Sequence, residues 1–170
     1  MNHDKHTDAA FTEAMKLFAD NRYPDSIVML TDVIEMDPNH RLALMARGSA
    51  HMKLSQPEEA LADFDRVIGM NPEDARAHHL RGLTRERGGD DEGAISDFDR
   101  AIELDPSYGA AYYSRSNLYA KLGKEDLAME DIQMVTALTR INAEAYANDN
   151  NVWHTHHMRV EEEMGTELAR

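Results

Sequence analysis

The sequence predicts an all-α fold in which helix hairpins stack along one axis. Three dipeptides that end in proline recur at an interval of 34 residues: Asp37-Pro38, Asn71-Pro72 and Asp105-Pro106. Each dipeptide follows an apolar run with helical spacing. A proline cannot continue such a helix, because it lacks an N–H and disfavours helical geometry in the residue before it. A period of this length is typical of a solenoid, in which each unit packs only against its neighbours.

Each unit is predicted to be a pair of antiparallel helices. In the second unit, Leu44, Gly48 and His51 share one helical face, and a second apolar run extends from Ala60 to Ile68. The break between the two runs ends at Pro57, which suits the first turn of a helix. The pattern recurs over four units, which follow a disordered N-terminus at residues 1–6: residues 7–40, 41–74, 75–108 and 109–142.

Small residues recur at two places in every unit, one on each helix. The first helices carry Ala14, Gly48, Gly82 and Ser116, and the second helices carry Ser26, Ala60, Ala94 and Ala128. Helix axes approach most closely, to about 8 Å, where the residues in contact are small. These two columns therefore predict the line along which the helices of each hairpin meet.

This pattern resembles the tetratricopeptide repeat (TPR) family, whose 34-residue unit carries small and aromatic residues at fixed places. The match runs through Gly48…Ala60-x3-Phe64…Pro72 and Gly82…Ala94-x3-Phe98…Pro106. It is looser in Ala14…Ser26-x3-Leu30…Pro38 and in Tyr112-x6-Tyr119…Ala128-x3-Ile132. The resemblance implies a right-handed α-solenoid and a non-enzymatic protein-interaction module, that is, an adaptor or scaffold.

The fourth unit lacks its closing proline, because Arg140 stands in that place. Residues 143–170 are expected to form a long C-terminal capping helix and tail. An apolar seam marks this helix, and it consists of Tyr146, Asn150, Trp153, His157, Val160 and Met164. The helix covers the last hairpin or, in the alternative interpretation, joins two copies. The alternative function is thus a structural TPR protein that self-assembles through this helix or through an end of the solenoid.

An arginine precedes the small residue of the first helix in three units, and an aspartate follows it sixteen residues later. The expected pairs are Arg47 with Asp63, Arg81 with Asp97, and Arg115 with Asp131. The favoured interpretation is an ion pair that ties the two helices of a hairpin together. The other interpretation is a row of arginines that binds an acidic ligand. The first unit has Glu13 and Met29 at these places and cannot form the pair.

In the TPR family, partners usually lie in the concave groove that the first helices line. Carried over by register, this groove consists of Phe11, Met15, Phe18, Met45, Ser49, Met52, His79, Leu83, Glu86, Tyr113 and Asn117. Apolar surface of this kind typically binds protein, and methionine adapts to varied shapes. We therefore expect an apolar or amphipathic peptide, most simply a helix, to bind there. Alternatively, the protein's own residues or a second copy fill the groove.

Other functions are disfavoured by what the sequence lacks. The groove offers none of the lysine and arginine side chains with which some TPR co-chaperones grip a C-terminal carboxylate. A formal net charge of −14 disfavours binding to nucleic acid or to anionic membrane. No membrane-inserting segment, catalytic constellation, cofactor motif or cysteine is found. The expected location is the cytoplasm. Metal binding by His154, His157 and Glu161 is a minor alternative to a metal-free tail.

Overall fold

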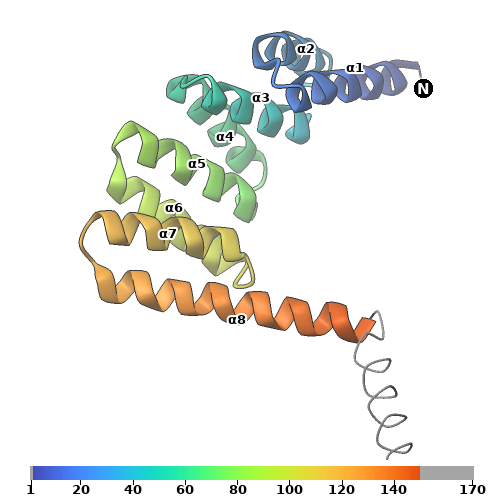
Figure 1. Ribbon diagram of the computed structural model, residues 1–170. Coiled ribbons are helices and arrows are strands. Elements are labelled where there is room, and N and C mark those ends of the chain that lie inside the picture. The colour runs from blue at the N-terminus through green and yellow to red at the C-terminus, as the bar shows by residue number, and fades with distance from the viewer. Residues whose placement is uncertain (1, 150–170) are drawn as a thin grey trace, which may run out of the picture.

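The computed structural model describes residues 2–149, which form eight helices (Figure 1). They pair in chain order into four antiparallel hairpins. The helices are α1 (Asn2–Ala19), α2 (Tyr23–Met36), α3 (Arg41–Lys53), α4 (Pro57–Met70), α5 (Ala75–Gly88), α6 (Asp91–Leu104), α7 (Gly109–Lys121) and α8 (Glu125–Asp149). The predicted all-α stack of hairpins is therefore confirmed.

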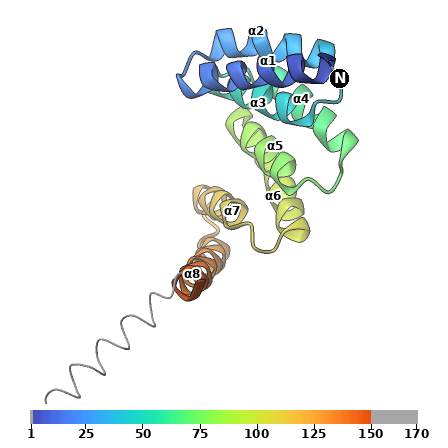
Figure 2. The ribbon, with the colours of Figure 1, turned by 90° about the vertical axis from the view of Figure 1, so that its right-hand side faces the viewer.

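The hairpins follow one another along one axis, as the two views at right angles show (Figures 1 and 2). The second helix of each hairpin packs against the first helix of the next, so that α2 contacts α3, α4 contacts α5 and α6 contacts α7. The N-terminus lies at one end of the stack and α8 at the other (Figure 2). Each hairpin thus touches only its neighbours, as in other solenoids.

The prolines end helices as expected. Asp37, Asn71 and Asp105 are the C-caps of α2, α4 and α6, and each has the extended backbone that a following proline favours. Their side-chain oxygens accept hydrogen bonds from the backbone N–H two residues later, at 3.1, 3.3 and 2.9 Å. The chain therefore turns at the same place in each of the first three units.

The turn inside each hairpin depends on one residue with a left-handed backbone. This residue is Asn21, Ser55, Gly89 or Gly123, with φ of 60°, 57°, 84° and 71°. The four lie 34 residues apart, so the same turn is built four times. Glycine adopts this conformation without steric cost and asparagine tolerates it, whereas serine is strained there.

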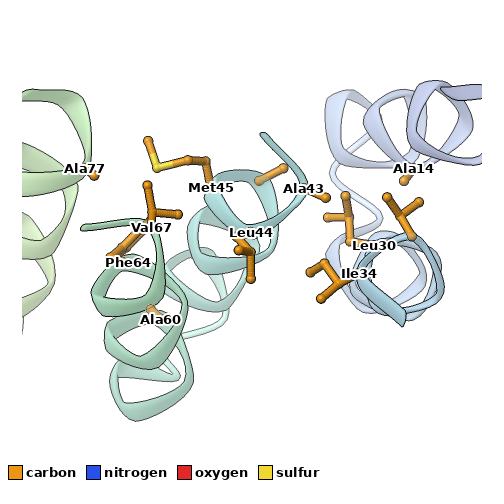
Figure 3. Packing of buried hydrophobic residues seen from close by; sticks show 12 residues of the cluster. Ala14, Leu30, Ile34, Ala43, Leu44, Met45, Ala60, Phe64, Val67 and Ala77 are labelled. Atoms are coloured by element: carbon orange, nitrogen blue, oxygen red, sulfur yellow. The ribbon is translucent and has the colours of Figure 1, made fainter. Parts of the chain in front are cut away.

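The largest core cluster gathers side chains from α1 to α5 (Figure 3). The small residues of the first helices allow their partner helices to come close. A Cβ atom built on Gly48 would lie 2.8 Å from the Phe64 ring, and one on Gly82 would lie 2.7 Å from the Phe98 ring. Glycine is therefore required where the facing side chain is phenylalanine.

Both ends of the chain differ from the prediction. Helix α1 begins at Asn2, so residues 2–6 are helical rather than disordered. Helix α8 continues through residues 143–149, so this stretch, with Tyr146, extends the fourth hairpin and does not begin a separate capping helix. No proline or glycine lies in residues 2–19 or 125–149, so neither α1 nor the described part of α8 contains a residue that breaks a helix. The other seam residues, from Asn150 to Met164, lie outside the described residues.

Candidate functional site

Each of the three expected arginines binds the aspartate of its own hairpin. The Nη2 atoms of Arg47, Arg81 and Arg115 lie 2.7, 2.6 and 2.7 Å from Oδ1 of their partners, which are Asp63, Asp97 and Asp131. The aspartates are buried and the arginine side chains are 17–20% exposed. These arginines therefore point into the stack and tie the two helices of a hairpin together.

The same arginines also reach backward to the preceding hairpin. Their Nη1 atoms donate hydrogen bonds to side chains of its second helix: Thr31 Oγ1 at 3.1 Å, Asp65 Oδ1 at 2.7 Å, and Asp99 Oδ1. The partner lies sixteen residues before each arginine, as the aspartate lies sixteen residues after it. This second contact was not predicted, although the spacing of 16 residues is present in the sequence in both directions.

These bonds stabilise the charged form of two of the arginines, Arg81 and Arg115. The hydrogen bond to Asp97 raises the pKa of Arg81 above its ordinary value, against a smaller opposing effect of burial. The bond to Asp131 does the same for Arg115. Asp97 also accepts a hydrogen bond of 2.8 Å from Arg85. Because the guanidinium groups serve the chain's own carboxylates, an acidic ligand in this row is disfavoured.

The first predicted groove column consists of Phe11, Met45, His79 and Tyr113. Met45 and His79 are only 5% and 7% exposed, so they pack inside the stack and do not line an open groove. Tyr113, in the last hairpin, is 54% exposed. This column faces the following hairpin, and such a neighbour covers it in the second and third units. The register of the repeat predicts where each of these residues lies within its unit, but it does not predict whether a neighbouring hairpin buries the side chain.

His79 joins the third hairpin to the fourth. Its Nδ1 lies 3.1 Å from the Tyr108 hydroxyl and its Nε2 lies 2.9 Å from the Ser114 hydroxyl. The imidazole also packs against the rings of Phe98 and Tyr108. Burial, with a smaller contribution from the positive charge of Arg76, lowers the pKa of His79 to about 4. The neutral ring donates one hydrogen bond and accepts the other.

The other predicted groove residues are more accessible. Asn117 is exposed, and six are half-buried: Phe11, Met15, Phe18, Ser49, Leu83 and Glu86. Burial raises the pKa of Glu86, although Lys121 opposes this effect. Met52 is also half-buried, and it lines a pocket of about 280 Å³ with Ser55, Gln56, Pro57, Thr84 and Arg87. This pocket lies where the α3–α4 turn meets α5, and it is large enough for one apolar side chain.

Residues 2–149 contain neither a membrane-spanning helix nor a metal-binding cluster. No helix in this part of the chain is long and apolar enough to cross a membrane. Among the same residues, no group of three or more histidines and carboxylates is placed to hold a metal ion. The histidine-rich stretch with His154, His157 and Glu161 lies outside them.

Comparison with solved structures gives the same fold. The chain is 24% identical to the structure of MamA 41–end from Desulfovibrio magneticus RS-1. The match covers 79% of this chain and 76% of the MamA chain, with a TM-score of 0.73. A second similar structure is the first TPR of Spaghetti (RPAP3) bound to the HSP90 peptide SRMEEVD, at 23% identity, 69% and 93% coverage and a TM-score of 0.65. At these identities the likeness shows the fold alone.

Comparison with curated proteins finds no match. The family described as tetratricopeptide repeat, however, matches three overlapping stretches of the chain, at residues 11–62, 45–109 and 92–140. Together these stretches cover residues 11–140, which is most of the sequence, and they include parts of all four hairpins. The chain belongs to the tetratricopeptide repeat family.

Proposed function

We propose that this TPR protein is an adaptor that binds an apolar or amphipathic helical peptide along its first helices. The pocket beside Met52 carries the proposal, because it lies at the end of a predicted groove helix and opens beside apolar atoms of Met52 and Pro57. One apolar side chain of the peptide enters this pocket. The rest of the helix lies along Leu83 and Asn117 in the neighbouring hairpins.

The similar RPAP3 structure, which holds the peptide SRMEEVD, supports a peptide partner. The chemistry of the partner differs, because the groove positions of this chain carry Met15, Ser49 and Leu83 rather than cations. A peptide selected by apolar side chains fits these residues better than one selected by carboxylates. The net charge of −14 further favours a peptide with basic flanking residues.

The adaptor is non-catalytic and works in the cytoplasm. Its binding surface consists of apolar side chains and a few polar ones, and it requires neither a metal nor a cofactor. A chain without cysteine also suits a reducing compartment. As an adaptor, it would link the protein that carries the bound peptide to a second binding partner.

The test begins with a display library of random peptides selected on the full chain. A selected peptide is then titrated by fluorescence anisotropy against the wild type, Met52→Glu and Val28→Glu. Met45 is unsuitable for this purpose, since a charge there would disrupt the core. Val28 is 62% exposed on α2, so its substitution is the matched control.

We expect Met52→Glu to weaken peptide binding at least tenfold with unchanged helicity, and Val28→Glu to bind like the wild type. Arg87 lies at the same pocket, and Arg87→Glu should change the preferred flanking charge of the peptide. Failure to enrich any peptide, or equal binding by Met52→Glu and the wild type, contradicts the proposal.

A further inference from the structure

The C-terminal end of the stack exposes positions that earlier hairpins bury. We define the C-terminal end face as Tyr113, Met129 and Ile132, which are 54%, 58% and 39% exposed. The counterparts of Ile132 in the first three units are fully buried: Leu30, Phe64 and Phe98. Within the described residues, the last hairpin therefore ends in a surface suited to a further hairpin.

The N-terminal end of the stack is also unfinished. Ala9 is exposed, yet its counterparts in the next three units have no exposed surface: Ala43, Ala77 and Ala111. A hollow of about 750 Å³ opens in front of α1 and α2. We define the N-terminal end face by four residues that line it, Ala9, Glu13, Met29 and Met36. The small residue needed at a junction between hairpins is thus present in the first hairpin, where none of the described residues packs over it as at the inner junctions.

One polar pair at the two ends is complementary, and the N-terminal hollow is also lined by the carboxylates Asp32 and Glu35. At the inner junctions an arginine of the first helix binds the second helix of the preceding hairpin, as Arg115 binds Asp99. At the N-terminal end Glu13 takes the place of the arginine, and at the C-terminal end Gln133 takes the place of Asp99. A glutamine amide donates to a glutamate, whereas an aspartate would repel it.

A second residue of the first hairpin, Met29, also differs from its counterparts in the later hairpins. Met29 stands where the next three hairpins have a buried aspartate, so Glu13 faces no carboxylate within its own hairpin at that place. Glu13 instead pairs with Lys16 at 2.9 Å on the surface of α1. The first hairpin therefore has no buried aspartate at this place that would oppose the charge of Glu13.

The lengths of the terminal helices agree with this pairing. Helix α1 has 18 residues and α8 has 25, whereas the six helices between them have 13 or 14. At every inner junction the first helix begins where the second helix of the preceding hairpin ends. The N-terminal extension of α1 and the C-terminal extension of α8 would therefore run side by side across a junction.

We propose that a second copy of this chain continues the stack, with its α1 and α2 packed on α7 and α8 of the first. The contact joins two different surfaces, so each added copy leaves another end free and the assembly grows. This inference goes beyond the peptide-binding proposal. It uses the ends of the stack, and its tests leave Met52 and its pocket unchanged.

Sedimentation velocity of the full chain over a range of concentrations tests the proposal. We expect the average mass to rise with concentration past that of two copies. Ile132→Glu and Ala9→Arg each remove one end face and should sediment as monomers. An equal mixture of these two variants should form dimers that do not grow, because one intact face of each kind remains. The control Val28→Glu should assemble like the wild type.

A charge exchange gives a second test with variants that resemble inner hairpins. Gln133→Asp restores the residue found at Asp65 and Asp99, so it should fold normally, yet it should weaken assembly about tenfold by facing Glu13. Adding Glu13→Arg recreates the inner junction and should restore assembly.

Four results would overturn the proposal. The first is a full chain that stays monomeric at every concentration. The second is a mixture of Ile132→Glu and Ala9→Arg that forms no dimer. The third is a Gln133→Asp variant that assembles like the wild type. If Met134→Glu alone abolishes assembly, the outer face of α8 is the contact and the proposal also fails.

Discussion

The contact between Gly82 and Phe98 gives the sharpest prediction for stability. A Cβ atom added at Gly82 would lie 2.7 and 2.9 Å from two atoms of the Phe98 ring. Carbon atoms in contact prefer separations of about 3.5–4.0 Å, so the buried ring must move by about 1 Å. Such overpacking costs about 1–3 kcal/mol, and the better helix propensity of alanine returns at most about 1 kcal/mol. We expect Gly82→Ala to lower the free energy of unfolding by about 1–2 kcal/mol.

The chain itself indicates the compensating change. The first hairpin places Leu30 opposite Ala14, and the second and third place phenylalanine opposite glycine. Phe98→Leu should therefore relieve the clash, so that the double variant loses less stability than the two single variants together, by at least about 1 kcal/mol.

Urea unfolding followed by circular dichroism at the helical band measures these differences. Gly69→Ala is the matched control, because a Cβ atom there meets nothing within 4 Å. It should stabilise the protein by up to about 1 kcal/mol. The reasoning is refuted if Gly82→Ala is as stable as the wild type, or if the effects of Gly82→Ala and Phe98→Leu add.

Three further predictions concern the turns and the polar contacts. Ser55→Gly removes the strain of a left-handed serine backbone (φ 57°), so it should stabilise the protein by about 0.5–1 kcal/mol and raise its melting temperature. An unchanged melting temperature would mean that the turn is not strained. Asp97→Ala leaves Arg81 and Arg85 without a buried partner, so it should lower the free energy of unfolding in urea by about 3 kcal/mol. Asp99 has a side chain that is 45% exposed, so Asp99→Ala should lower it by less than about 1 kcal/mol. Equal losses for the two variants contradict this ranking. His79 has a lowered pKa of about 4, so its contribution is complete above the ordinary pKa of 6.5 and is lost as pH falls toward 4, by at most about 3 kcal/mol. The His79→Met variant should lack this part of the acid dependence, and an identical pH profile for both proteins would refute it.

The repeat fold was predictable because its signals are local. Proline at 38, 72 and 106 ends a helix whatever surrounds it, and the small residues in the two columns are small for every partner. The pairing of Arg81 with Asp97 was predictable for the same reason, since a hairpin brings residues sixteen apart into contact at a fixed place.

The candidate site was less predictable, because exposure depends on the neighbouring hairpin. Met45, His79 and Tyr113 share one place in the repeat, but only Tyr113 is exposed. The second contact of each arginine needs the preceding hairpin in position, and so does the hydrogen bonding of His79 between Tyr108 and Ser114.

The sequence by itself therefore determined the unit, its length and its number, because helix breaks and small residues act within one hairpin. The tertiary structure decided which members of each column are buried and which arginine contacts cross a junction, and it showed that residues 2–6 and 143–149 belong to α1 and α8. It also leaves the N-terminal and C-terminal end faces exposed at opposite ends of the stack. These features depend on what packs against a hairpin from outside, and the pattern within a single unit does not contain that information.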